Sequence, residues 1–475
     1  MSNKSKLPFF CVLIAVAILL HSQPSYAQNS DNPDSELIQL LNPWWSEALQ
    51  ASRGIQSSQA SAAVKAGELD AAHAAFYPTL RASAEGGPSQ TKLWNAKGPV
   101  TPENKTEWSA QAGLAASLNL YQGGLSLLRV DAAKNGVQVS NLELESTQAS
   151  LATGMARELV TIWRQWRSLV ESESLLGQAK TLQKIAQRKQ KSGFLGTKQL
   201  LEADREAFRS ESERNAAAAS LENRIALFNS RYRLESAPLQ SPQLAAFEMS
   251  MEQLAERNRS RVADSSPAEQ LEGRSLDLRR SQLNLASSEI QQTIARRERY
   301  GLSLDALAGV ANRFIDTVNT PEAARALAPE RSLNIYAQLS LSINVFAPQT
   351  SAMAEVARLR TQQALILQTK QKDDLALFLM NIRQQWPILL ESQAFNRKLV
   401  EMSEDLRSKN TRLFEAGEVD TFVVIAGQKE LALQKQALSA AQARIYDLAV
   451  RQAAAFQLGL VLNVDSPDIV GNTLQ

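Results

Sequence analysis

Cysteine and histidine are almost absent from this sequence. Its 475 residues include one cysteine, Cys11, and two histidines, His21 and His73. So few thiol and imidazole groups exclude disulfides, thiolate metal sites and most histidine-based catalytic arrangements. His73 alone is more simply an exposed or packed helix residue than a ligand. We therefore expect no metal, no cofactor and no catalytic residue, and the protein is not expected to be an enzyme.

A surplus of positive charge is also lacking. Lys and Arg number 51 against 49 Asp and Glu, whereas a nucleic-acid binder usually carries a clear basic excess. No glycine-rich phosphate loop is found, and no acidic cluster stands out from ordinary helix surface charge. The sequence thus predicts neither a nucleic-acid partner nor an ATP site.

Long apolar runs are missing after the first residues. Residues 1–27 have a basic start, an apolar run from Pro8 to Leu20 and a small-residue cleavage motif ending at Ala27, which predicts a secretory signal peptide. Cys11 lies inside that run, so it is a poor candidate for lipid attachment. Because no later segment has 18 consecutive apolar residues, an exported chain is left with two options: no membrane contact, or a β-barrel.

Period-two alternation is present in four places. One apolar set is Trp108, Ala110, Ala112, Leu114, Ala116, Leu118 and Leu120, and a second is Leu333, Ile335, Ala337, Leu339, Leu341, Ile343 and Val345. Each is preceded by a shorter alternating run, so we predict strands at about 75–86, 108–122, 300–312 and 332–347. The short phrase Ser117-Leu118-Asn119-Leu120-Tyr121 returns as Ser342-Ile343-Asn344-Val345-Phe346.

The predicted strands are long enough to cross a membrane, for which about 9–11 residues suffice. Aromatic residues lie near their ends, where interfacial girdles belong: Phe76, Tyr77, Trp108, Tyr121, Tyr300, Phe314 and Phe346. Four strands cannot close a membrane barrel, since about eight is the minimum. Two copies would supply eight strands and three copies twelve; the alternative is two hairpins of a soluble sheet.

A long helix follows each strand pair. We predict helices at about 49–74, 125–190 and 197–232, and again at about 267–297, 351–414 and 421–458. Residues 125–190 contain no proline and at 1.5 Å per residue make a rod of roughly 100 Å. Each long helix ends at a glycine turn, at Gly193 or Gly417, before a second helix returns from Thr197 or Thr421.

The two halves therefore share one plan of strand, strand, long helix, turn and helix. This predicts a first structural repeat at 28–240, a second at 241–460 and an irregular tail at 461–475. The fold class expected is an α+β membrane protein built as a tandem repeat.

This arrangement resembles the TolC-like outer-membrane efflux proteins. The resemblance is carried by the string from Ala75 to Leu80 entering the first strand, the string from Leu118 to Gly124 leaving the second, and the paired turns at Gly193 and Gly417. It spans about residues 51–460. It implies a homotrimer with a shared β-barrel in outer-membrane lipid, four strands per chain, and a periplasmic α-helical barrel, in the cell outer membrane of a Gram-negative bacterium.

The function that the resemblance implies is that of a passive, gated conduit in type I protein secretion or tripartite efflux. A periplasmic adaptor protein and an inner-membrane ABC or proton-driven transporter would be its partners. Docking at the tip turns would involve Gly193, Gly417, Thr197 and Thr421. The barrel-to-tunnel junctions would be at Tyr121, Gly123 and Gly124, and at Phe346 and Pro348.

The sequence departs from the family pattern at the first junction and at the tip turns. Gln122 stands where family members often have an acidic residue, and Gln199 and Val423 where the tips often have aspartate. An acidic gate is therefore not carried over. The alternative function is a periplasmic or surface coiled-coil scaffold without a pore.

Overall fold

The computed structural model describes residues 36–90, 94–95, 98–99, 106–235, 238–263, 267–317, 330–344 and 347–461. The predicted signal peptide, residue Phe346 and all but the first residue of the predicted tail lie outside these ranges.

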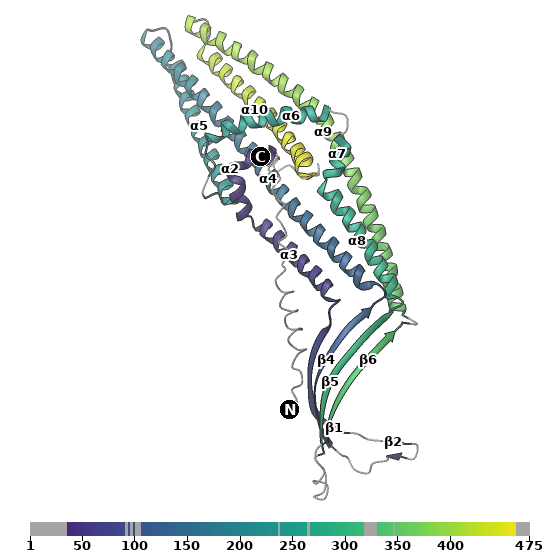
Figure 1. Ribbon diagram of the computed structural model, residues 1–475. Coiled ribbons are helices and arrows are strands. Elements are labelled where there is room, and N and C mark those ends of the chain that lie inside the picture. Colours follow the sequence, from purple (N-terminus) through teal and green to yellow (C-terminus); the bar gives the residue numbers. More distant parts are fainter. Residues whose placement is uncertain are drawn as a thin grey trace, which may run out of the picture.

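The molecule is a long helical rod with a sheet at one end (Figure 1). Two antiparallel helix pairs run its length: α4 (Leu125–Lys191) with α5 (Thr197–Tyr232), and α9 (Pro348–Ala416) with α10 (Thr421–Leu458). The 67 residues of α4 make a helix of about 100 Å. The turns that end the two pairs lie side by side at the end of the rod farthest from the sheet (Figure 1); we call them the first tip, residues 184–201, and the second tip, residues 413–425.

All four predicted strands join one antiparallel sheet. Its order is β1 (Thr79–Gln90), β4 (Thr106–Tyr121), β5 (Ser303–Thr317) and β6 (Glu330–Ser342). The central pair, β4 and β5, comes from different halves of the chain, so each half supplies two strands. A two-stranded ladder of β2 (Trp94–Asn95) and β3 (Gly98–Pro99) lies between β1 and β4 in sequence.

Two further helices complete the rod near the sheet. Helix α3 (Arg53–Ala74) packs on α4, and α8 (Leu276–Glu298) packs on both α4 and α9. Each of these helices therefore lies beside a long helix along the part that the returning helix does not reach. The predicted tandem repeat of strand, strand, long helix, turn and helix is confirmed.

Two helices were not predicted, and two predicted helices have different limits. Helices α2 (Glu36–Ala51) and α6 (Gln243–Ala263) are additional. The helix expected from about 49 begins at Arg53, because Ser52 caps it by accepting a hydrogen bond from the Ile55 N–H at 3.4 Å.

The helix expected at about 267–297 is divided into α7 (Pro267–Arg274) and α8. Ser275 separates the two, and its hydroxyl accepts a hydrogen bond from the Leu278 N–H at 3.3 Å. The Leu276 N–H donates to the Gly459 carbonyl at 2.9 Å instead of continuing the α7 ladder. A tertiary contact therefore breaks this helix.

The main core lies midway along the rod, where α2 and α6 pack across the long helices (Figure 1). Met155, Leu159 and Ile162, which recur at helical spacing along α4, are fully buried there. The ring of buried Trp163 meets that of Tyr446 edge-on, with centroids 4.9 Å apart. Among the described residues, no helix is both long enough and apolar enough to cross a membrane.

A buried chain of hydrogen bonds fixes α6 against α9 and α10. The Trp386 Nε1–H donates to Gln452 Oε1 at 2.8 Å, and Gln452 Nε2 donates to the Asn258 carbonyl at 2.7 Å. Asn258 Nδ2 in turn donates to the Ala449 carbonyl at 2.8 Å. Gln452 and Asn258 are fully buried, so neither has water to replace a lost partner.

Replacing Gln452 with leucine is expected to lower the free energy of unfolding by about 2–3 kcal/mol, because the Trp386 N–H and the Asn258 carbonyl lose their partner in a dry site. Urea unfolding followed by circular dichroism measures this. Gln436→Leu, an exposed position on the same helix, is the control and should change stability little. Equal midpoints for the two variants would contradict the role given to Gln452.

Candidate functional site

The sheet has one apolar face. Rows of paired residues cross it, including Leu114, Val310 and Ile335, and then Ala116, Ala308 and Ala337. Ile335 and Leu339 remain 76% and 65% exposed. Large apolar side chains this exposed need a cover of lipid or protein.

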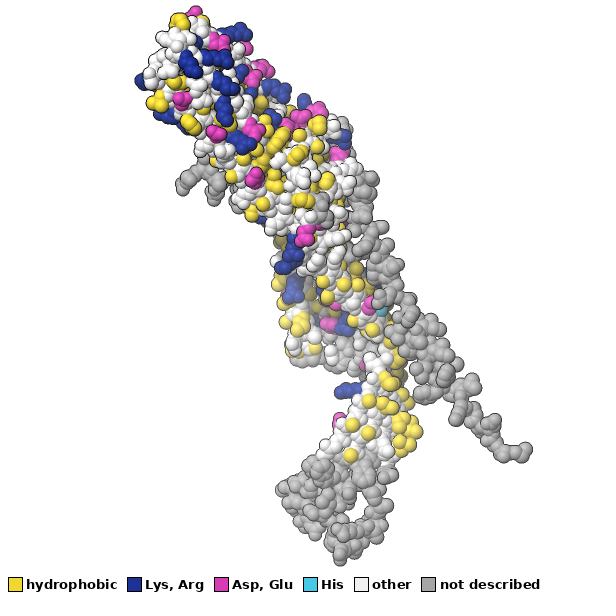
Figure 2. Space-filling view, turned by 90° about the vertical axis from the view of Figure 1, so that its left-hand side faces the viewer, with side chains coloured by type: hydrophobic (Ala, Val, Ile, Leu, Met, Phe, Trp, Pro, Cys, Tyr) yellow, Lys and Arg dark blue, Asp and Glu magenta, His cyan; other side chains and the backbone are white. Residues whose placement is uncertain are grey.

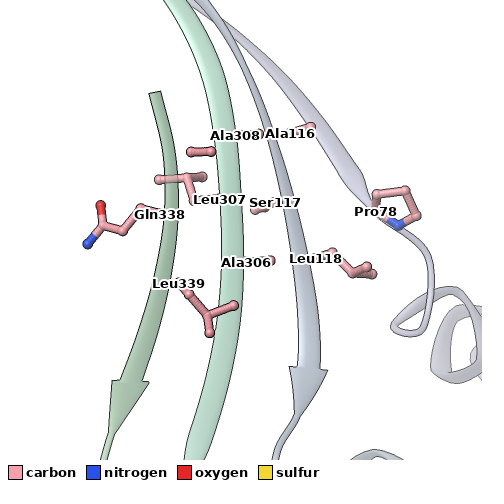
Figure 3. Close-up of a pocket in the computed structure, with 10 residues that line it drawn as sticks. Pro78, Ala116, Ser117, Leu118, Ala306, Leu307, Ala308, Gln338 and Leu339 are labelled. Carbon is pink, nitrogen blue, oxygen red and sulfur yellow. The ribbon is translucent and has the colours of Figure 1, made fainter. Parts of the chain in front are cut away.

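The alanine row makes a shallow hollow in this face. A groove of about 450 Å³ is lined by the three alanines together with Pro78, Leu118 and Leu339. Figure 3 shows Ala116 and Ala308 beside one another and Ala306 between the longer Leu118 and Leu339, with Gln338 extending away from β6. The surface offered to an apolar neighbour is therefore ridged, with no deep pocket.

The opposite face is polar. Asn119 Nδ2 donates to Asp305 Oδ1 at 2.5 Å across β4 and β5, and Ser303 and Ser342 join their hydroxyls at 2.7 Å. The Tyr336 ring crosses β5 at Gly309, where a Cβ would stand 2.6 Å from the Tyr336 hydroxyl. A sheet with one apolar face and one polar face has the pattern of a membrane β-barrel wall.

Glycines turn the chain at the predicted junction between sheet and rod. Tyr121 ends β4 and is half exposed, and Gly123 and Gly124 both have positive φ, 60° and 76°. The Arg297 Nη1–H of α8 donates to the Gly123 carbonyl at 3.0 Å. In the second half, Pro348 is the first residue of α9, whereas Phe346 lies outside the described residues.

Both tip turns use the same backbone motif. Gly193 (φ 76°) is bracketed by hydrogen bonds from the Gly193 N–H to the Gln190 carbonyl and from the Phe194 N–H to the Lys189 carbonyl. Gly417 (φ 87°) has the same pair of bonds one repeat later. These are Schellman motifs, which need a left-handed residue at the glycine position.

The two predicted threonines differ. Thr197 begins α5 and is exposed. Thr421 begins α10, is fully buried, and its N–H donates to Asp420 Oδ1 at 2.6 Å. The two tips therefore have the same type of turn, but the threonine after the turn is exposed in the first tip and buried in the second.

Two polar contacts join the first tip to the second. Lys189 Nζ donates to the Phe414 carbonyl and lies 4.8 Å from the centre of the Phe414 ring. Gln199 Nε2 donates to Asp420 Oδ1 at 2.8 Å. Beneath them is a small apolar cluster built from both helix pairs: Leu182, Ala186, Ala203, Phe414, Val424 and Ile425.

Farther from the tips, charged groups are buried between the helix pairs. Lys429 Nζ of α10 lies 2.8 Å from Glu206 Oε2 of α5, whose side chain is only 6% exposed. The Ser439 hydroxyl donates to Glu171 Oε1 at 2.6 Å, and burial raises the pKa of the Glu171 carboxyl despite Arg167 and Lys435 nearby. Buried charged contacts of this kind add little net stability, because the cost of desolvating the charges offsets their attraction.

The structure thus brings Gly193 and Gly417 to one end of the rod and Tyr121, Gly123, Gly124 and Pro348 to its other end, where the sheet begins. Sequence reasoning missed the contacts of Lys189 with Phe414 and of Gln199 with Asp420. Only their positions, three to six residues from the glycines, could have drawn attention to them. No group of acidic, histidine or cysteine side chains within the described ranges could hold a metal ion.

Comparison with known proteins agrees with this geometry. The family described as outer membrane efflux protein matches residues 44–229, which include β1, β4, α4 and most of α5. Residues 44–229 are an outer membrane efflux protein domain. No curated protein matches the sequence.

Solved structures extend the likeness to both repeats. VceC from Vibrio cholerae has a TM-score of 0.65 at 15% identity, over 88% of this chain and 96% of its own. The Campylobacter jejuni CmeC outer membrane channel has 0.62 at 14%, over 92% and 91%. The Neisseria gonorrhoeae MtrE outer membrane channel has 0.58 at 14%, over 89% and 89%.

The fold of this outer membrane efflux protein domain and of the repeat that follows it is therefore TolC-like, as the sequence predicted. The domain contains the first junction and the first tip turn, and the second repeat contains their counterparts.

Proposed function

We propose that this chain is the subunit of an outer-membrane export channel that extends into the periplasm. The observation that carries the proposal is the sheet: four strands with an exposed apolar face, at one end of a rod about 100 Å long. A membrane barrel needs at least about eight strands, so several copies must share one. Three copies give twelve strands, the number that the resemblance implies.

The long helix α9 supports assembly of several copies. Ile388, Phe395 and Met402 recur every seven residues along it and are 64%, 61% and 69% exposed in the single chain. A seven-residue apolar repeat is the seam of a coiled coil. A neighbouring copy that covers this seam would continue the helical layer into a closed tunnel.

The conduit would be passive. A periplasmic adaptor and an inner-membrane transporter, either ABC-type or proton-driven, would supply the energy and deliver cargo by type I secretion or tripartite efflux. Of the tip residues, the exposed Gly193, Thr197 and Gly417 would meet the adaptor, whereas the buried Thr421 would hold the second turn in place. Tyr121, Gly123, Gly124, Phe346 and Pro348 would hold the barrel on the tunnel.

Arginine substitutions on the two faces of β6 test the barrel. Leu339→Arg places a charge on the apolar face and should cost about 2–4 kcal/mol near the membrane midplane, so less protein should reach the membrane fraction. Gln338→Arg, the neighbouring residue on the polar face, is the matched control. It should assemble normally and shift the ion selectivity of the pore in planar bilayers.

The mass of the detergent complex and the bilayer conductance of the unmodified protein complete the test. A trimer with small, discrete conductance steps is expected. A water-soluble species without pore activity, in which both arginine variants behave alike, would favour the pore-less coiled-coil scaffold instead.

A further inference from the structure

The two tips carry opposite charge. The first tip, residues 184–201, includes five Lys or Arg and no Asp or Glu, whereas the second tip, residues 413–425, includes three acidic residues and no basic one. Figure 2 shows charged side chains of both signs at this end of the rod. The repeats that share a fold and a turn motif have therefore diverged in what they present at their ends.

Helix electrostatics do not account for this difference. Arg188 and Lys191 lie in the last turn of α4, where cations are favourable. Lys198, however, lies in the first turn of α5, where a cation opposes the helix dipole. Glu415 likewise lies in the last turn of α9, where an anion is unfavourable. Each tip therefore carries its own sign of charge even at a position where the helix dipole favours the opposite sign.

The basic side chains of the first tip are also free of acidic partners. Lys184, Arg188, Lys191 and Lys198 are exposed, and within the described part of the chain none of these four forms an ion pair. Lys184, Arg188 and Lys191 are spaced by four and three residues, so they form one stripe on α4. That stripe lies opposite buried Leu182, so it points away from the cluster between the helix pairs.

Large apolar side chains stand beside these cations. Phe194, in the turn itself, is 84% exposed, and Leu201 is 68% exposed one helical turn after Lys198. Aromatic and aliphatic anchors next to cations are what a protein interface uses, the anchors for affinity and the charges for steering and orientation. The second tip also exposes an aromatic residue, Phe422 at 67%, but the charged residues nearest to it in sequence are acidic, Glu418 and Asp420.

We infer that the first tip is the principal docking site of the periplasmic partner, and that the docked segment is an acidic amphipathic helix. Its apolar stripe covers Phe194 and Leu201, and its carboxylates face Lys184, Arg188, Lys191 and Lys198. The second tip, with Glu415, Glu418 and Asp420, repels such a segment and so fixes which of the two tips it occupies. This inference rests on the proposed function, because it names the chemistry of the adaptor surface.

Photo-cross-linking in cells of the native host tests the inference. A photoreactive phenylalanine analogue replaces Phe194 in the full chain, and in a second strain it replaces Phe422; cross-linked peptides are then sequenced. The expected product at 194 is a segment of another envelope protein with apolar residues at helical spacing and a clear acidic excess. A cross-link to a second copy of this chain, to a basic or neutral segment, or to nothing would overturn the inference.

Charge reversal gives the second measurement. Lys191→Glu with Lys198→Glu should reduce the cross-link at 194 by about tenfold or more, because attraction becomes repulsion. Lys370→Glu with Lys372→Glu, two exposed residues of α9 far from the tips, makes the same change in net charge and should leave the yield unchanged. Equal cross-link yields in both double variants would contradict the role given to the charges of the first tip.

Conductance separates this inference from the proposed function. The variants at 191 and 198 should still form trimers that conduct in planar bilayers. If the unmodified protein conducts but the predicted cross-link is absent, only the inference fails. If the acidic helix is captured but no pore forms, the channel function fails and the docking surface stands.

Discussion

Alanine in place of Gly459 is expected to lower the free energy of unfolding by about 4 kcal/mol, near the top of the range for single substitutions. Gly459 ends α10 with φ 68°, a left-handed conformation that costs other residues about 1–2 kcal/mol. An added Cβ would also stand 2.2 Å from the Arg274 carbonyl oxygen and 3.2 Å from Leu276 Cγ. The first of these atoms is backbone, so α7 and α8 would have to move.

That movement would break contacts on both sides of Gly459. The hydrogen bond from the Leu276 N–H to the Gly459 carbonyl and that from Arg274 Nη1 to the Phe456 carbonyl hold the α7–α8 break against α10. Urea unfolding of the detergent-solubilised protein, followed by far-ultraviolet circular dichroism, gives the loss. Gly177→Ala in α4 is the control: its Cβ meets nothing within 4 Å, and removing a helical glycine should stabilise by about 0.5–1 kcal/mol. Similar behaviour of the two variants would contradict the steric argument.

The second large effect is expected at the tips. Lys189→Met combined with Gln199→Ala removes both polar contacts between the first and second tips. Losing about 2 kcal/mol that favours the joined tips would raise the population of separated tips about 30-fold. In the proposed channel this should appear as a similar rise in open probability in planar bilayers.

Lys184→Met with Gln187→Ala serves as the control for the tip variant. Both residues are exposed on α4 and form no hydrogen bond or ion pair with α9 or α10 among the described residues. This pair should leave the open probability unchanged. If the contact-removing pair also leaves it unchanged while the trimer is intact, the two contacts do not hold the tips together.

The periodic elements of the fold could be predicted because their signal is local. Leu333 to Leu341 alternate along one strand, and Met155 to Ile162 follow a helical stripe, so each pattern is readable within one element. The turns at Gly193 and Gly417 were predictable for the same reason, since a Schellman motif needs glycine at one defined position.

The two helices that were not predicted, α2 and α6, show two different limits of prediction from sequence. The apolar residues of α6, Leu244, Phe247, Met251 and Leu254, recur at helical spacing, so the helix itself was readable, but its position across the rod was not. Helix α2 contains Pro43, and an Asn-Pro pair usually indicates a turn. Burial of Leu37, Leu41 and Trp44 in the main core overrides that local preference.

The tip contacts and the break at Ser275 depend on residues far away in the chain. Lys189 meets Phe414 across 225 residues, and Gln199 meets Asp420 across 221. Leu276 reaches the carbonyl of Gly459, which lies in another helix pair. No local pattern records such partners, because the side chains involved would be equally acceptable facing water.

The pairing of β4 with β5 sets an order for folding. Asn119 and Asp305, which meet in that pair, are separated by 186 residues, and contacts between distant residues form late because a long loop must first close. The helix pairs have short turns and can form early. Once α4 lies beside α8, Gly123 is held against Arg297 and the loop that β4 and β5 must close is already drawn together. We therefore expect the rod to form first and to bring β4 and β5 together, and a fragment that ends at residue 229 would leave β4 without its central partner.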